Sequence, residues 1–244
     1  MDLKKLLRNI CKDHVLAPCA VFQKSGTVEW PVTIENEDAL EKLLKEGGHF
    51  LPLPTEPAAL ANVLEESIAT YVIEKINEIK GVQAVKGTDR GYPDVEIKFK
   101  GAYHALDIKV AKRGPGINTQ SRITLYTGNT YFRYPQHHWP GTFRPFADYA
   151  SHLDLVALYT FNGMTDSRID NLQILIHSPW EIASRRRSST TREYIGAVQK
   201  IADLEAGRGE FGSEKEFYDY WRKYQFKQAA AAGIILTKLL EAKK

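Results

Sequence analysis

The sequence predicts an α/β fold in which a mixed central β-sheet is flanked by helices. A stretch at about 58–80 carries apolar residues at helical spacing, and apolar or alternating segments with strand character follow it along the chain. The predicted strands are 82–86, 94–99, 103–110, 153–161 and 172–177. Because no repeat or low-complexity linker interrupts this order, we expect one domain that carries its functional groups on loops.

Composition narrows the class of protein. The 244 residues are 43% hydrophobic and 11% aromatic, which is enough for a large core. Lys and Arg number 33 against 30 Asp and Glu, and a net charge of +3 does not by itself establish a nucleic-acid partner. The two cysteines, Cys11 and Cys19, argue against a disulfide framework or a zinc site. Since no apolar run could span a bilayer, we expect a cytoplasmic protein with no membrane partner.

Four elements are predicted before the long helix: a helix at 2–13, a β-hairpin formed by 19–23 and 27–33, a short charged helix at 37–46, and an extended loop at 49–57. Ser25-Gly26 supplies the turn of the hairpin, and Asn36 is the expected N-cap of the charged helix. Three prolines exclude regular structure from the loop.

Besides the strands at 153–161 and 172–177, six segments are predicted after the strand at 103–110: a flexible Gly/Pro/Lys-rich stretch at 111–120, an aromatic stretch without clear period at 128–146, a basic Ser/Thr-rich loop at 185–192, and three helices at about 194–205, 213–224 and 227–242. Helices are therefore expected to close the chain.

Two acidic side chains and one lysine are brought together by the predicted hairpin. Tyr92-Pro93-Asp94 opens its first strand, and twelve residues separate Asp94 from Asp107. That spacing accommodates one strand, a turn at Lys100-Gly101 and a returning strand. Lys109 lies two residues beyond Asp107 and therefore shares its strand face. Both carboxylates and the ammonium are thus predicted to meet at one end of the hairpin.

This group of side chains has the chemistry that a phosphodiester-cleaving nuclease needs. Mg²⁺ prefers oxygen ligands and is commonly held by one or two carboxylates together with substrate phosphate. The lysine can hold an attacking water or offset negative charge on the phosphate. The alternative is an ordinary hairpin with a turn aspartate and a solvated Asp/Lys pair, because so short a pattern can arise by chance.

Further segments carry a stronger signal: the helix segment 73–81, Trp180, Ser188-Ser189-Thr190-Thr191, Ile195-Gly196, and the string from Phe211 to Tyr224, Phe-Gly-Ser-Glu-Lys-Glu-Phe-Tyr-Asp-Tyr-Trp-Arg-Lys-Tyr. Together with the hairpin, they resemble the EcoRV-type type II restriction endonucleases, a branch of the PD-(D/E)xK nuclease superfamily. The C-terminal string is too long to be a chance match. The resemblance covers most of the chain from about residue 57 onward.

The resemblance implies a restriction-endonuclease-like core with a C-terminal helical DNA-binding region, in a single domain that spans 1–244. Residues 1–56 would hold the N-terminal helix, the hairpin and an insertion at 36–56. Residues 57–127 would form the catalytic core, and residues 128–244 the DNA-recognition and C-terminal helical part.

The resemblance also implies roles for individual residues. Asp94 and Asp107 would bind Mg²⁺ beside the scissile phosphate, and Lys109 would orient the attacking water or stabilise charge on the phosphate. Glu66 aligns with a helical acidic residue that the family places near the metal site, with Glu65 as the alternative if the alignment is shifted. Glu96 shares the strand face of Asp94 and could reach the metal instead, or be an exposed strand residue.

The basic loop is expected to read bases, because arginine is the commonest bidentate partner of guanine and hydroxyl groups bind either bases or phosphates. Its residues are Arg185, Arg186, Arg187, Ser188, Ser189, Thr190, Thr191 and Arg192. By analogy, Arg90 would lie near the minor groove, and Lys112 and Arg113 would contact phosphates. A solvated basic loop and a plain turn are the alternatives. The family's own recognition loops differ here, so the resemblance extends to the chemistry and not to the DNA sequence that is read.

We therefore predict a Mg²⁺-dependent type II restriction endonuclease that hydrolyses double-stranded DNA at a short palindrome and leaves blunt ends with 5′-phosphates. A palindrome has two equivalent strands, so a two-fold homodimer is expected, and the cell would need a cognate DNA methyltransferase. Two alternatives remain: a DNA repair or junction-resolving nuclease on the same core, and a catalytically dead DNA-binding module.

Overall fold

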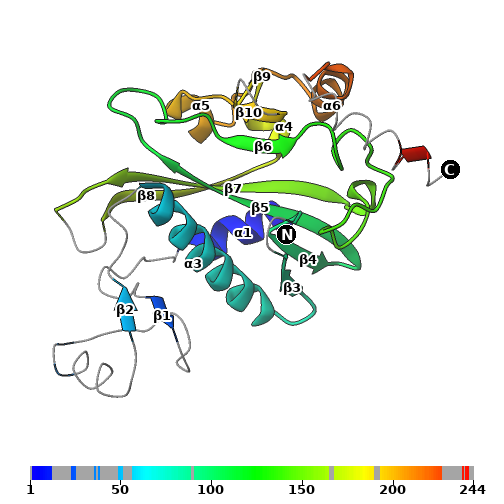
Figure 1. Ribbon diagram of the computed structural model, residues 1–244. Helices are drawn as coiled ribbons and strands as arrows, with labels where there is room; N and C mark the ends of the chain where they lie inside the picture. The colour runs from blue at the N-terminus through cyan, green and yellow to red at the C-terminus, as the bar shows by residue number, and fades with distance from the viewer. Residues whose placement is uncertain are drawn as a thin grey trace.

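The structure is a computed structural model that describes residues 2–12, 23–25, 36, 38, 49–51, 57–88, 91–164, 168–189, 193–226, 238, 240 and 241. A five-stranded sheet runs across the molecule, with two helices on one side and a smaller sheet with short helices on the other (Figure 1). A separate antiparallel pair is formed by β1 (Gln23–Ser25) and β2 (His49–Leu51).

The main sheet is mixed, as its class predicts. Its strands in spatial order are β3 (Gln83–Lys86), β4 (Val95–Phe99), β5 (Ala102–Lys112), β7 (Ser151–Phe161) and β8 (Ile169–His177). Neighbouring strands are antiparallel except for β5 and β7, which are parallel. All five strands lie where the sequence predicts them, so the predicted α/β class is confirmed.

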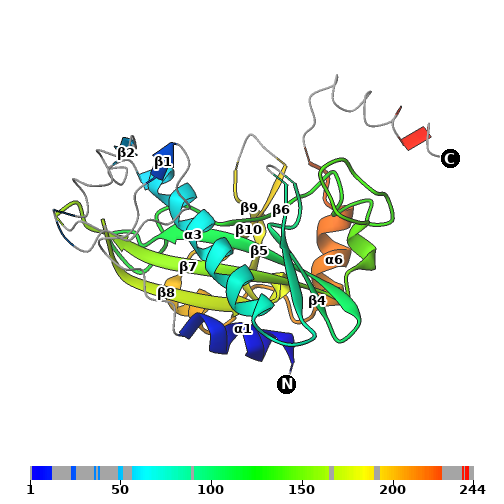
Figure 2. The same cartoon turned by 90° about the horizontal axis from the view of Figure 1, so that it is seen from below.

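Two helices cover one face of this sheet. α1 (Leu3–Lys12) and α3 (Pro57–Asn77) lie on the same side of it, as the view in Figure 2 shows. Their apolar stripes, with Leu7, Ile68 and Val72 fully buried, pack against the aliphatic side chains that β4, β5 and β7 direct towards the helices. Complete burial of each such side chain contributes about 1.5–3 kcal/mol, so this aliphatic core is what holds both helices to the sheet.

A second sheet covers the opposite face. Its strands are β6 (Thr124–Thr127), β10 (Tyr194–Ala197) and β9 (Ala183–Arg187), and the helices on this side are α4 (Pro179–Ile182), α5 (Ile201–Glu205) and α6 (Glu214–Lys223) (Figure 1). A 3₁₀ helix, η1 (Phe146–Asp148), precedes β7. This core is rich in aromatic side chains: Tyr92, Tyr126, Phe132, Phe146, Phe217 and Trp221 are all buried in it. The face that carries Asp94 and Asp107 is therefore lined by rings.

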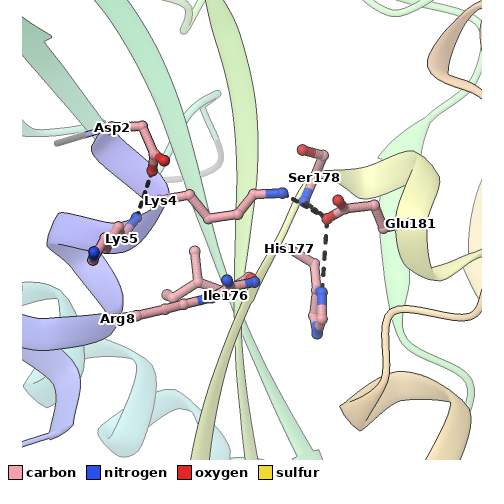
Figure 3. A network of polar contacts seen from close by, with 8 residues as sticks. All are labelled: Asp2, Lys4, Lys5, Arg8, Ile176, His177, Ser178 and Glu181. Carbon is pink, nitrogen blue, oxygen red and sulfur yellow. Dashed lines mark hydrogen bonds and ion pairs between the residues drawn. The ribbon is translucent and has the colours of Figure 1, made fainter.

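Glu181 of α4 ties α1 to the sheet (Figure 3). Its Oε2 accepts hydrogen bonds from Lys4 Nζ and from the Ser178 backbone N–H, each at 2.7 Å, and lies 3.7 Å from His177 Nδ1. Burial raises the pKa of Glu181, but the contacts with His177, Lys4 and Ser178 outweigh burial and bring the pKa to about 2. Glu181 is therefore an ionised carboxylate that joins α1, α4 and the end of β8.

Two predictions for the C-terminal part are wrong. The sequence predicts a loop at 185–192, but residues up to Arg187 belong to β9. It also predicts a helix at 194–205, where the structure has β10 followed by the shorter α5. Pairing of Ile195 with Arg187 and of Ala197 with Ala183 forms both strands. β10 also pairs with β6, which lies far away in the sequence, and such tertiary pairing overrides local preference, which is why the local pattern was misleading.

The segment predicted to be flexible is an ordered turn. β5 runs on to Lys112, and isolated bridges join Arg113 to Thr119 and Asn118 to Lys200. β2 likewise lies in the stretch predicted to be an extended loop. The predicted strand at 27–33 and the predicted helices at 37–46 and 227–242 fall outside the described residues, apart from single positions.

Within the described part of the chain, no helix combines the length and the hydrophobicity that a bilayer crossing requires.

Candidate active site

The β4–β5 hairpin sets the positions of the two predicted carboxylates. Lys100 and Gly101 both have positive φ, 51° and 80°, as a two-residue type I′ turn requires. The turn closes a register in which Val95 pairs with Leu106. Asp94 immediately precedes Val95 and Asp107 immediately follows Leu106, so the predicted meeting of the two carboxylates at one end of the hairpin is found in the structure.

Direct contacts hold this group together. Asp94 Oδ2 accepts a hydrogen bond from the Ile108 backbone N–H at 2.6 Å. Lys109 Nζ lies 2.5 Å from Asp107 Oδ2. Asp107 is buried, whereas the Lys109 side chain keeps 22% of its surface exposed. The Lys109 side chain is therefore held by Asp107 and is still partly exposed to solvent.

Gly87 allows the chain to approach Asp94 closely. Its backbone N–H donates to the Asp94 carbonyl at 2.7 Å. A Cβ at position 87 would lie 2.1 Å from the Pro93 carbonyl oxygen, far inside van der Waals contact. Glycine is thus required here for a packing reason, and the loop after β3 braces the residue that carries the first carboxylate.

The charges of the site perturb one another. Burial, followed by the negative charge of Asp107, raises the pKa of Asp94 to about 7. Burial alone would lower the pKa of Lys109, but Asp107, Asp94 and the further carboxyl of Asp154 outweigh burial and raise it. Lys109 is therefore a permanent cation, and Asp94 is a carboxylate that carries an electrostatic cost at neutral pH.

The donor set fits a hard divalent cation. Two carboxylates from adjacent strands face each other, and a cation between them would remove the repulsion that, together with burial, raises the pKa of Asp94. In the described part of the chain, no three His, Cys, Asp or Glu side chains converge closely enough to form a complete protein cage. Mg²⁺ needs no such cage, because water and substrate phosphate complete its coordination.

Glu65 is the acidic residue of α3 whose pKa is affected by the charges of the site. Burial raises the pKa of Glu65, the charge of Asp94 raises it further, and Lys109 partly offsets both. Glu66, the residue predicted from the resemblance, forms an ion pair with Lys86. The structure therefore brings the alternative, Glu65, into the field of Asp94 and Lys109.

Two clefts open at the site, and Glu65 lines both. One has a volume of about 560 Å³ and is lined by Lys109, Lys112 and Arg122 among others. The other has a volume of about 410 Å³ and includes Asp94 in its wall. The larger cleft thus carries two further cationic side chains, Lys112 and Arg122, beside Lys109. Sequence reasoning missed Arg122, which follows the turn at 114–119 with no distinctive local pattern.

Asp154 is a second residue that sequence reasoning missed. It is fully buried on β7, and the parallel register places it opposite Asp107. The available signal was a charged residue between Leu153 and Leu155 in an otherwise apolar strand. Glu96, in contrast, is committed elsewhere: Arg144 binds both of its oxygens, at 2.7 and 2.8 Å, and Tyr149 donates to it at 3.0 Å.

The basic residues of β9 differ in what they contact. Arg185 pairs with Glu216 and stacks on Phe211 and Tyr220, with its guanidinium carbon 4.6 and 5.0 Å from the ring centres. Arg186 is exposed and has no side-chain hydrogen bond or ion pair among the described residues. The remaining predicted base readers that the structure describes are Arg187 and Ser189, both half-buried, and Ser188, whose Oγ lies 2.7 Å from Thr124 Oγ1.

The predicted phosphate contacts also have partners within the chain. Arg113 donates to Gln173 Oε1 at 2.6 Å and lies 3.8 Å from Glu205. Lys112 Nζ lies 5.0 Å from the centre of the Phe161 ring. Four other predicted DNA-binding residues fall outside the described residues: Arg90, Thr190, Thr191 and Arg192.

A mixed sheet whose adjacent strands present two facing carboxylates and a lysine beside a basic cleft is the core of a restriction-endonuclease-like nuclease. The family model described as "Restriction endonuclease EcoRV" matches residues 28–242, so the chain belongs to that family. It is also similar to the "Type II restriction enzyme EcoRV" of Escherichia coli, with 23% identity over 201 residues, which cover 75% of this chain and 81% of the relative. The protein is accordingly a DNA-binding hydrolase, a type II site-specific deoxyribonuclease.

Proposed function

We propose that this endonuclease depends on Mg²⁺, recognises a short palindrome and leaves blunt ends with 5′-phosphates. The observation that carries the proposal is the convergence of Asp94, Asp107 and Lys109 at one end of the β4–β5 hairpin. The basic cleft with Lys112 and Arg122 in its wall supports a polyanionic substrate beside these groups. Membership of the family supports double-stranded DNA as that substrate.

The proposed roles follow from the chemistry of each side chain. Asp94 and Asp107 would hold the cation, which when bound would offset negative charge on the scissile phosphate. Lys109 donates hydrogen bonds from its ammonium to the attacking water or to a phosphate oxygen. Water attacks phosphorus in line, the bond to the 3′ oxygen breaks, and the products are a 5′-phosphate and a 3′-hydroxyl. We assign Glu65 as the auxiliary acidic residue, in preference to Glu66, because its charge is coupled to Asp94 and Lys109.

We propose that β9 and the residues after it contact the bases, and that Lys112 and Arg113 lie along the phosphate backbone. Both are amphipathic cations at the rim of the site, and a rearrangement of their partners would free them for DNA. Because the two strands of a palindrome are equivalent, the active form would be a two-fold homodimer, and a DNA methyltransferase would protect the cell's own sites.

Cleavage of phage-sized DNA, with Mg²⁺ or with EDTA, tests this function when the product ends are sequenced. We expect discrete fragments with Mg²⁺ and none with EDTA. Asp94→Ala and Lys109→Ala should lower the cleavage rate by about 100-fold or more, because each removes a group that stabilises the transition state, while DNA binding persists.

Lys98→Ala is the matched control, since Lys98 is an exposed lysine on the same hairpin. It should cut like the wild type. Full activity in both Asp94→Ala and Lys109→Ala would overturn the catalytic assignment. A smear or structure-dependent nicking would point to a repair or junction-resolving nuclease, and binding without any cleavage would point to a dead scaffold.

A further inference from the structure

Asp154 is a buried carboxyl that costs the fold stability. It is fully buried in the middle of β7, between Leu153 and Leu155. Among the residues that the structure describes, neither of its carboxyl oxygens has a hydrogen-bond partner. Nearly all buried polar side chains have such a partner, and one without it loses the hydration it had in the unfolded chain. An apolar residue of similar size would suit this position better, so packing does not account for the carboxyl.

The position of Asp154 relates it to the active site. The parallel register pairs Asp107 with Asp154 and Lys109 with Val156, so all four side chains lie on the same face of adjacent strands. Burial has the largest effect on the pKa of Asp154 and raises it, while the charge of Lys109 lowers it and that of Asp94 raises it. Asp154 in turn raises the pKa of Tyr92 and Tyr126, which burial raises first. The carboxyl thus lies within electrostatic range of Lys109 and of two buried tyrosines.

Asp107, the charge partner of Lys109, would have to interact with both the ammonium and the cation. In the structure its ammonium pairs with Asp107 Oδ2 at 2.5 Å. In the proposed function, Asp107 also binds the cation, and a carboxylate whose oxygens are turned towards a divalent ion attracts an ammonium more weakly. Lys109 then needs a second negative group on the same side of the sheet. Asp154 is the carboxyl that the neighbouring strand supplies there.

We propose that Asp154 is a positioning residue for catalysis: it holds the Lys109 ammonium in the site when Asp107 engages the cation. The inference rests on the catalytic role of Lys109 proposed above. It predicts that Asp154 lowers stability and raises activity, because its charge is useful only in the working site. A residue that merely supported the fold would raise both together.

Two substitutions of similar size test the proposal. Asp154→Asn removes the charge and keeps the shape, and Asp154→Leu replaces the carboxyl with the apolar group that the surroundings favour. We expect either to raise the Tm of the cation-free protein by about 2–4 °C. We also expect binding of the cognate DNA in EDTA to be unchanged, and the single-turnover cleavage rate in Mg²⁺ to fall by about 10- to 100-fold, the usual cost of losing a group that orients a functional side chain.

Asp170→Asn is the matched control. Asp170 lies on β8, pairs with Thr160 far along β7 from the site, and accepts a hydrogen bond from Asn162 Nδ2 at 2.6 Å. It should cleave like the wild type and, because it loses a satisfied contact, gain no stability. If Asp154→Asn and Asp154→Leu both cut within about twofold of the wild type, the proposal is overturned. Loss of Tm, DNA binding and cleavage together in both variants would overturn it equally, in favour of a structural role.

A thermodynamic cycle isolates the pair of side chains. Asp154→Asn should raise Tm more in a Lys109→Met background than in the wild type, because without the ammonium three carboxyls are left unneutralised. Equal shifts in the two backgrounds would show that Asp154 does not act through Lys109. This readout needs no activity, so it is independent of the cleavage assays. If the wild type failed to cut, or Lys109→Ala cut normally, the proposed function would fall while the cycle would still report on the electrostatic coupling between Asp154 and Lys109.

Discussion

Asp94 and Asp107 repel each other across two adjacent strands, and this repulsion adds to the effect of burial in raising the pKa of Asp94. The Ile108 N–H and the Lys109 ammonium each neutralise part of it. The sequence allowed the convergence of Asp94, Asp107 and Lys109 to be predicted, because a hairpin with a two-residue turn brings residues together by local geometry. Asp154 could not be predicted in the same way. It reaches the site through the parallel pairing of β5 with β7, which no local pattern encodes.

The titration of Asp94 predicts how cation binding depends on pH. Its pKa is raised from 3.8 to about 7, so the cost of ionising it in the folded protein is absent below about pH 4, grows between pH 4 and 7, and is complete above that range. A bound divalent cation removes this cost and competes with the proton. We therefore expect Mg²⁺ or Ca²⁺ to raise Tm more at about pH 8 than at about pH 5.

Differential scanning fluorimetry at the two pH values measures this difference directly. Asp94→Ala should abolish most of the Tm shift at both pH values, which ties the shift to this carboxylate. An equal shift at both values in the wild type would contradict the prediction.

At the scale of elements, β9 shows where the local pattern fails. Three consecutive arginines next to a run of Ser and Thr are typical of an exposed loop, yet pairing with β10 makes them a strand. Strand geometry then sends Arg185 and Arg186 to opposite sides. Arg185 packs against α6, while Arg186 lies near Arg122, whose pKa burial lowers first and the charge of Arg186 lowers further. In this basic run, Arg185 thus packs within the fold, while Arg186 remains available to bind DNA.

This difference predicts different outcomes for two alanine substitutions. Arg186→Ala should weaken binding of the cognate site relative to other sequences by about 10- to 100-fold without a change in Tm, if it reads a guanine. Arg185→Ala should lower Tm, because α6 loses the ion pair with Glu216 and the stacking on Phe211 and Tyr220.

Competition binding with cognate and non-cognate duplexes in EDTA, together with thermal melts, separates the two effects. The prediction fails if Arg185→Ala changes discrimination more than Arg186→Ala does.

At the scale of the whole molecule, the sheet with different cores on its two faces explains what composition and periodicity could reveal. Aliphatic residues at helical spacing identified α1 and α3, which pack on one face. The aromatic stretch at 128–146 resisted assignment because it forms turns and a 3₁₀ helix, and its rings pack against β6, β7 and α6. Irregular backbone has no period, so only the folded structure shows that this stretch supplies the second core.

The expected palindrome predicts the size of the active particle. Light scattering during size-exclusion chromatography should give twice the 27.6 kDa mass of one chain, both free and, with the duplex mass added, on DNA. Two active sites acting on equivalent strands should produce double-strand breaks with little nicked intermediate. A 27.6 kDa particle that still makes site-specific double-strand breaks in one binding event would contradict the dimer.

The central position of β5 in the sheet predicts how cooperatively this enzyme is inactivated by heat. Asp107 and Lys109 lie on a strand that is hydrogen-bonded to β4 on one side and to β7 on the other, with helices packed beneath it. Amide hydrogens on such a strand exchange with solvent only when the whole domain opens, because no fraying edge is near. Asp107 and Lys109 therefore cannot be displaced one at a time by local unfolding. Inactivation by heat should be as cooperative as unfolding itself, and cooling should restore cleavage to the extent that the chains refold.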